Sequence, residues 1–512
     1  MNALLICLLL CQVDQKLVDA FWEQENPTRI AKKILRAEPD FDALWAALSA
    51  PRNYSKDVPT GRIEARHALR GTWYPYVLQV PENYDPSQAY PLVFCLHGGV
   101  ARPKEETFRI FDTTPIVSDS HITVYPQGWD RALWWRAVQI ENLHIILNLV
   151  KSRYRVDTNR VHIMGISDGG TGVYYQAFKA PTDWASFTSL IGHSAVLANP
   201  SNYAEGTMFP INLKNSRFFA ANGAHDRLYP VHQVMPYVAL FHSLGCDLQF
   251  TPLPFSGHNI FWLRQSDRGL GDFWQSSLRQ AHPAQLVWET DDPKRFGRRS
   301  WLVIDEIDDD FGKPESFEFP RVHLEPYLGI EMNVDQPLVV FNVVASSPAQ
   351  LTGLAKGDRI THVNEQQIHT DQELWQAALD LRQLRLTVER DGASYQATLN
   401  LPASVWSKPT TAFPTKAHSG RVSVQVEQQE IHCESTGVSA FRLLISPQAF
   451  DFKAPIKVVV NGVTAFDDIV RGDPSILMKW ASIDRDPAQL YGAEITIEAP
   501  TPSSEPKIQS KE

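Results

Sequence analysis

Strand-like and helix-like stretches alternate along residues 62–283, and this alternation constrains the fold more than any other feature. Strand character is clearest in PLVFCLHG, HITVYPQ, RVHIMGIS, RFFAANGAHD and LQFTPLP. The clearest helix lies at residues 142–154, where one apolar face is formed by Leu143, Ile146, Leu147, Val150 and Tyr154. Such alternation is typical of a mostly parallel sheet covered by helices, so the sequence predicts an α/β fold.

One serine lies between glycines where a strand-like run ends, in VHIMGISDGGTG at residues 161–172. Gly165 and Gly169 flank Ser167, and the stretch that follows has helical character. A strand, a sharp turn with a serine and a helix together make a nucleophile elbow, in which a Cβ on either glycine would clash. The pattern predicts Ser167 as a nucleophile; the alternative is an ordinary strand-to-helix turn.

A serine hydroxyl needs a histidine to take its proton and a carboxylate to orient that histidine. Asp226 follows the strand-like RFFAANG, and His258 lies in the loop after LQFTPLP. The gaps between Ser167, Asp226 and His258 each have room for one helix and one strand. The HGG sequence after PLVFCL ends a strand with His97, Gly98 and Gly99, whose exposed backbone N–H groups can face an oxyanion together with that of Asp168.

Through LHGG, GISDGG, GAHDRLYP and GHN, residues 62–283 resemble α/β-hydrolases of the esterase, feruloyl-esterase and polyhydroxybutyrate-depolymerase-like group. The resemblance covers somewhat under half of the chain. It implies Ser167 as nucleophile, His258 as general base and acid, Asp226 as orienting carboxylate, and Gly99 and Asp168 as oxyanion donors. The acidic Asp168 departs from the family pattern. Its side chain is interpreted as stabilising the next helix N-terminus, with substrate contact as the alternative.

A differently patterned block at residues 320–403 resembles a PDZ domain of the bacterial envelope-protease type, through YLGI, SPAQLTGLAKGDRI and DQELWQAAL. The resemblance implies that the N–H groups of Leu328, Gly329 and Ile330 capture a peptide's terminal carboxylate. The peptide then adds a strand and places a side chain against the helix near Leu374. The alternative is a module that only packs on its own chain.

The segments on either side of this block, residues 286–318 and 405–500, are both β-rich. Because neither is long enough for a stable sandwich, we expect one discontinuous domain, with the PDZ-like block inserted in it or adjacent to it. The NG in IKVVVNGVTAF predicts a hairpin turn. Residues 14–61 predict a helical lead-in packed on the domain that follows, and the polar residues 501–512 predict a disordered tail.

Residues 1–13 include the apolar run ALLICLLLC, which is too short to span a bilayer and has the length of a signal-peptide core. This run predicts a signal peptide and a secreted or periplasmic protein. The alternative is a packed N-terminal helix in a cytoplasmic protein. No other segment has about 18 continuous apolar residues, so no transmembrane span is predicted.

The net charge of -10 and the absence of a Lys/Arg cluster exclude nucleic acid as an expected partner, because binding to phosphates needs concentrated positive charge. His144, His162 and His193 lack metal-ligand spacing. We therefore predict neither a metal site nor a cofactor.

Together these features predict a serine hydrolase that cleaves carboxylic esters through an acyl-enzyme intermediate, acting on a small-molecule or polymer substrate. Polysaccharide-linked or phenolic esters are suggested by the family resemblance and by Trp134 and Trp135, which can form an aromatic platform or simply pack. Two alternatives stay open: a serine peptidase of the same fold, and a catalytically idle hydrolase fold that serves as a PDZ-containing binding protein.

Overall fold

The structure is a computed structural model, and it describes residues 13–104, 120–308, 317–322, 326–401, 407, 410–414 and 417–498. The predicted tail and all of the predicted signal peptide except Val13 lie outside these residues. Among the described helices, none is long and apolar enough to cross a bilayer.

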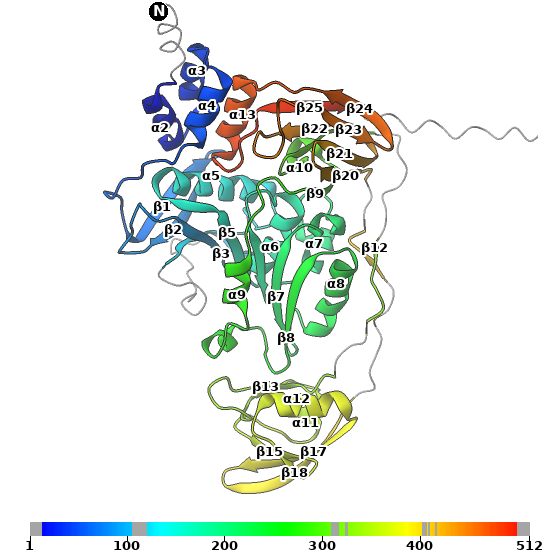
Figure 1. The fold of residues 1–512 in the computed structure, drawn as a ribbon. Coiled ribbons are helices and arrows are strands. Elements are labelled where there is room, and N and C mark those ends of the chain that lie inside the picture. The colour runs from blue at the N-terminus through cyan, green and yellow to red at the C-terminus, as the bar shows by residue number, and fades with distance from the viewer. Residues whose placement is uncertain are drawn as a thin grey trace, which may run out of the picture.

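A central sheet of eight strands in the order β1-β2-β4-β3-β5-β6-β7-β8 forms the middle of the molecule (Figure 1). The pairs β1–β2 and β2–β4 are antiparallel, and the remaining neighbours are parallel. The predicted α/β fold with a mostly parallel sheet is thus confirmed. The strands are β1 (Gly61–Leu69), β2 (Thr72–Val80), β3 (Tyr90–Leu96), β4 (Ile122–Pro126), β5 (Val156–Ile166), β6 (Ser186–Leu190), β7 (Arg217–Gly223) and β8 (Asp247–Leu253).

Helices cover both faces of this sheet, so nearly every residue of its inner strands β3, β6 and β7 is buried. One face packs on α5 (Ala137–Arg153), α6 (Asp168–Lys179) and α8 (Val231–Ser243). The other face packs on η3 (Phe261–Arg264) and α9 (Leu270–Ser276). The short elements α7 (Ala195–Ala198), η1 (Pro200–Asn202) and η2 (Pro210–Leu213) lie between β6 and β7 in the chain.

Two further sheets share one apolar core and come from both sides of the PDZ-like block. Their orders are β24-β23-β21-β20-β9 and β10-β11-β22-β25, and β9 pairs with β20 across the interruption. Asn461 and Gly462 both have positive φ between β23 and β24, as a two-residue hairpin turn requires. The elements are β9 (Gln285–Thr290), α10 (Pro293–Phe296), β10 (Arg298–Arg299), β11 (Leu302–Ile307), β20 (Gly420–Glu427), β21 (Glu430–Thr436), β22 (Val438–Ile445), β23 (Ile456–Val460), β24 (Val463–Asp468), α13 (Pro474–Asp484) and β25 (Ala493–Glu498).

Three helices precede the sheet, namely α2 (Gln15–Glu23), α3 (Thr28–Arg36) and α4 (Phe41–Ser49). Their apolar faces share one cluster with Leu477, Met478 and Ala481 of α13, which comes from near the other end of the chain (Figure 1). The expectation that the lead-in packs on the domain that follows is therefore incomplete, because most of its apolar partners lie on α13.

The PDZ-like block forms its own core and lies at the end of the molecule next to β8 (Figure 1). Its two connections run side by side: β12 (Phe317–Glu318) pairs with β19 (Thr411–Ala412), and Val322 exchanges two 3.0 Å hydrogen bonds with Ser407. Its elements are β13 (Ile330–Met332), β14 (Val340–Val343), α11 (Pro348–Leu351), β15 (Arg359–Val363), β16 (Gln366–Gln367), α12 (Asp371–Asp380), β17 (Gln383–Arg390) and β18 (Ala393–Asn400).

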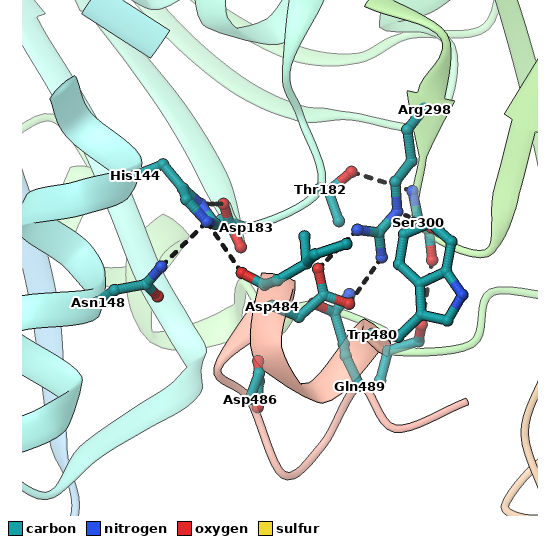
Figure 2. Close-up of polar contacts among 12 residues, drawn as sticks. His144, Asn148, Thr182, Asp183, Arg298, Ser300, Trp480, Asp484, Asp486 and Gln489 are labelled. Carbon is teal, nitrogen blue, oxygen red and sulfur yellow. Dashed lines mark hydrogen bonds and ion pairs between the residues drawn. The ribbon is translucent and has the colours of Figure 1, made fainter. Parts of the chain in front are cut away.

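A polar network joins α5 and the loop before β6 to α13 (Figure 2). His144 Nδ1 lies 3.0 Å from Asp183 Oδ2, and its Nε2 lies 3.1 Å from the Ile483 carbonyl oxygen. Arg298 forms a bidentate pair with Asp484, at 2.6 and 2.7 Å. The central sheet is thus tied to the helix that also holds the N-terminal helices.

Candidate active site

Ser167 occupies the sharp turn between β5 and α6, with φ 57° and ψ -117°. A Cβ on Gly165 would lie 2.2 Å from the Gly169 backbone, and one on Gly169 would lie 2.1 Å from the Leu96 carbonyl oxygen. Both flanking glycines are therefore required by the close approach of the backbone. The strand, turn and helix expected of an elbow are all present.

The structure brings Ser167, His258 and Asp226 together. His258 Nε2 lies 2.9 Å from Ser167 Oγ, and His258 Nδ1 lies 2.7 Å from Asp226 Oδ2. Asp226 can only accept at its ionised carboxylate, so Nδ1–H is the donor and Nε2 is left to accept from the serine hydroxyl. This is the arrangement in which an imidazole can take a proton from a nucleophile.

Asp226 and His258 are positioned by loops that follow the neighbouring strands β7 and β8. Asp226 Oδ1 accepts from the backbone N–H groups of Leu228 and Tyr229, at 2.8 and 3.0 Å. The two loops pack closely, since the His225 N–H group donates to the Ser256 carbonyl oxygen at 3.1 Å. The Asp226 side chain is fully enclosed, whereas the His258 side chain keeps 21% of its surface exposed. The imidazole can therefore meet a ligand that enters from solvent.

The loop after β3 passes directly over Ser167. A Cβ on Gly98 would lie 3.0 Å from Ser167 Cβ, and Gly99 has a positive φ of 69°. His97 braces this loop, because its Nε2 accepts from the Gly128 N–H group at 3.0 Å and its carbonyl oxygen accepts from Trp134 Nε1 at 2.8 Å. Sequence reasoning did not identify this bracing role, although the HGG motif pointed to the loop.

Asp168 is the first residue of α6, and its carboxylate reaches across to the same loop. Asp168 Oδ2 accepts from the Val100 backbone N–H group at 2.9 Å. The acidic side chain after the serine thus ties the elbow to the loop that carries Gly99, a contact that neither sequence-based interpretation of Asp168 included.

Three further side chains surround the Asp226–His258 pair. The Tyr229 ring lies edge-on to His258, with 5.8 Å between ring centroids, and His193 lies edge-on to Tyr229. Burial lowers the pKa of His193 to about 4, despite an opposing effect of Asp226. Burial also lowers the pKa of His225 to about 3. Both imidazoles are therefore neutral at pH 7. His225 and Tyr229 lie within the GAHDRLYP motif, but the sequence predicted a role there only for Asp226.

Trp134 and Trp135 are 1% and 5% exposed, so of the two interpretations packing holds and the aromatic platform does not. Trp134 Nε1 donates to His97, and Trp135 Nε1 donates to the Asn202 carbonyl oxygen. His162 bonds to Ser186 Oγ at 2.8 Å inside the core. In the described part of the chain, no three His, Cys, Asp or Glu side chains are grouped to hold a metal ion.

The residues predicted to form the peptide groove meet in one core. Leu328, Ile330 and Leu374 are fully buried, and Gly329 has a φ of 81°. A Cβ on Gly329 would lie 2.0 Å from Ser347 Cβ, which explains the glycine. The same apolar cluster also contains Phe255, a residue of the loop that leads from β8 to His258.

The strand order, the elbow at Ser167 and the loops after β7 and β8 define an α/β-hydrolase fold. The chain joins this fold to a PDZ domain, because the family model described as PDZ domain matches residues 326–401.

One curated protein is similar to part of the chain: the bifunctional acetylxylan esterase/xylanase XynS20E of Neocallimastix patriciarum, 27% identical over 115 residues. The match covers 22% of this chain and 17% of the relative's length. Similar solved structures include a thermostable esterase, at 17% identity with a TM-score of 0.32, covering 43% of this chain and 63% of that chain. Another is Est1E from Butyrivibrio proteoclasticus, at 14% identity with a TM-score of 0.32, covering 43% of this chain and 99% of that chain. The Pyrococcus horikoshii acylaminoacyl peptidase is 16% identical with a TM-score of 0.34, covering 44% of each chain.

Proposed function

We propose that the chain is a serine hydrolase that cleaves carboxylic esters. The observation that carries the proposal is the unbroken line of hydrogen bonds from Ser167 through His258 to Asp226, on the loops where an α/β-hydrolase holds its catalytic residues. A buried carboxylate, an imidazole and a hydroxyl aligned in this way make a nucleophile at neutral pH.

In the proposed reaction, Ser167 Oγ attacks the ester carbonyl carbon while His258 Nε2 takes its proton. The N–H groups of Gly99 and Asp168 stabilise the resulting oxyanion. The tetrahedral intermediate collapses, the C–O bond of the ester breaks, and the leaving alcohol takes the proton from His258. Water then attacks the acyl-enzyme with His258 as base, which releases the carboxylic acid and restores the serine.

The substrate class is proposed from the partial similarity to an acetylxylan esterase/xylanase, which supports an ester on a polysaccharide. Because Trp134 and Trp135 are both buried, they are not evidence for a substrate with a phenolic or sugar ring. A serine peptidase of the same fold is the second candidate, and the PDZ domain favours it because such domains bind peptides. The hydrogen bonds that join Ser167, His258 and Asp226 argue against the third possibility, a catalytically idle fold that serves as a binding protein.

Hydrolysis of p-nitrophenyl acetate by the full chain and by Ser167→Ala tests the proposal. We expect the variant to lose turnover by about 10,000-fold, as deletions of a serine nucleophile do. Ser394→Ala, at an exposed position of β18, is the matched control and is expected to keep full turnover. Unchanged hydrolysis by Ser167→Ala would remove the proposal. Faster cleavage of unstructured peptides than of acetylated oligosaccharides would favour the peptidase.

Export is also proposed, from the apolar run within residues 1–13. N-terminal sequencing of the protein from its producing cells tests it, because export predicts removal of this run. The division into residues 14–61, 62–283, 286–318 with 405–500, and 320–403 is proposed in the same sense, and limited proteolysis tests it.

A further inference from the structure

The hydrolase loop that leads from β8 to His258 enters the PDZ domain. Phe255 is 8% exposed and belongs to the apolar cluster that also contains Leu328, Ile330 and Leu374. Its ring lies edge-on to that of Trp375 on α12, with 6.0 Å between centroids. An aromatic side chain of the hydrolase therefore fills a position between the strand and the helix that a PDZ domain uses for peptides.

The backbone of the same residue bonds to the strand of this groove. The Met332 N–H group donates to the Phe255 carbonyl oxygen at 3.0 Å. Met332 ends β13, which pairs only with β14 in a two-stranded sheet of the described residues, so its second edge faces the loop. Addition of a backbone to a sheet edge, with a side chain placed in a pocket, is how PDZ domains take their ligands.

Two more contacts touch the residues directly before His258 and Asp226. The Glu331 carboxylate packs on Gly257, where an added Cβ would lie 2.3 Å from Glu331 Oε2. The Tyr327 ring lies edge-on to the buried His225 ring, with 5.0 Å between centroids. The segment at the head of the PDZ groove thus contacts both loops that hold the histidine and the carboxylate.

We propose that residues 254–258 are an internal ligand of the PDZ groove, and that Phe255, held in this groove, is a positioning residue for His258. The catalytic part of this inference rests on the proposed function, whereas the occupancy of the groove does not. The internal segment has no terminal carboxylate to offer to the loop at Leu328, Gly329 and Ile330. A free peptide C-terminus has one, and it competes with Phe255 for the groove.

The test compares Phe255→Ala and Phe255→Leu with Phe341→Ala, which removes an exposed ring from β14 in the same domain. Binding is measured by fluorescence anisotropy with a labelled decapeptide that ends in a valine carboxylate, and with its amidated twin. A peptide binds only those molecules whose groove is open, so its apparent affinity falls in proportion to the open fraction. We therefore expect Phe255→Ala to bind the carboxylate peptide about tenfold more tightly than the wild type. The amidated peptide is expected to gain much less, and Phe341→Ala to match the wild type.

Turnover of p-nitrophenyl acetate is measured on the same proteins. We expect Phe255→Ala to lower kcat about tenfold with little change in KM, because a displaced histidine impairs proton transfer more than binding. Phe255→Leu keeps an apolar anchor and is expected to restore most of both properties. Saturating carboxylate peptide is expected to slow the wild type, which gives a measurement that depends on no variant.

Equal peptide affinity in the wild type and Phe255→Ala would overturn the internal ligand, whatever the enzyme activity. A gain in affinity with unchanged kcat, or bound peptide that leaves wild-type turnover intact, would overturn the positioning role. If Ser167→Ala keeps full turnover, the proposed function fails by itself, and the anisotropy comparison still decides what occupies the groove.

Discussion

Asp226 combines complete burial with three accepted hydrogen bonds, from two backbone N–H groups and from His258. A buried carboxylate is costly unless its lone pairs are satisfied, and here the turn after β7 supplies two donors before the histidine adds a third. The turn thus fixes which oxygen faces His258, and with it the orientation of the imidazole.

Asp226→Asn is expected to lower kcat by about 1,000- to 10,000-fold while leaving the fold intact. An amide at this position donates to Nδ1, so Nε2 carries the proton and cannot accept the one from Ser167. Steady-state hydrolysis of p-nitrophenyl acetate measures the loss, and thermal unfolding controls for stability. A loss of less than tenfold would contradict the role assigned to Asp226.

At this scale the sequence located the residues whose placement is encoded locally. Ser167 is marked by two glycines, and Asp226 and His258 each follow a strand-like run in the order of an α/β-hydrolase. The bond from Asp168 to Val100 could not be predicted, because it joins the start of α6 to the loop after β3, which are brought together by the parallel pairing of β3 and β5. Burial of Trp134 and Trp135 has the same kind of origin, since adjacent aromatics look alike in sequence whether they pack or face solvent.

Among the elements, α13 joins parts of the chain that are far apart in sequence. It packs on the N-terminal helices. Its end meets α5, where His144 Nε2 lies 3.1 Å from the Ile483 carbonyl oxygen and Lys151 Nζ donates to the Asp484 carbonyl oxygen at 2.8 Å, and Figure 2 shows His144 and Asp484 in this network. Burial lowers the pKa of His144, but the Asp183 carboxylate raises it by more than burial lowers it. The net shift of the pKa is therefore upward. Burial likewise opposes ionisation of Asp183, yet its pKa falls because of His144 and, to a lesser extent, Lys151. The two directions agree and describe an ion pair.

The raised pKa of His144 determines how the stability of the folded protein changes with pH. Its stabilising contribution is complete below the unfolded value of about 6.5 and is lost as pH rises through the raised value in the folded protein. His144→Gln is therefore expected to lower Tm by roughly 1–2 °C more at pH 6 than at pH 9. Thermal unfolding at the two pH values measures the difference, with His369→Gln at an exposed position as control. An equal loss at both values would refute the ion pair.

Element boundaries were predicted less well than element types. The helix expected at residues 142–154 is α5, which begins at Ala137, because the residues of its first turn lack the apolar periodicity that marked the rest. The partners of α2, α3 and α4 were not predictable, since amphipathic spacing identifies a buried face without naming what covers it.

At the scale of the whole molecule, the PDZ domain is attached by two connections that lie together. Val322 and Ser407 bond to each other, and β9 pairs with β20 without help from the domain between them. The geometry is that of a domain inserted between two strands of another, which a host fold tolerates when the two connection points are adjacent. Contacts between Phe255 and this domain join residues far apart in sequence, so no local sequence pattern could predict them.

Replacement of residues 326–401 by a short Gly/Ser linker is expected to leave the rest of the chain folded, because the two connection points already touch. Turnover is expected to fall about tenfold, since His258 loses the contacts that hold its loop. Circular dichroism and thermal unfolding check the fold, and p-nitrophenyl acetate hydrolysis checks turnover. Full activity in this deletion variant would show that the PDZ domain has no part in the proposed catalysis.

The shared cluster of α2, α3, α4 and α13 has a consequence for biosynthesis. The first three helices leave the ribosome early, whereas α13 is translated only near the end of the chain. At a translation rate of about 5–20 residues per second, their apolar faces remain exposed for on the order of tens of seconds. We therefore expect the leading end of the nascent chain to be a binding site for chaperones until α13 has been made.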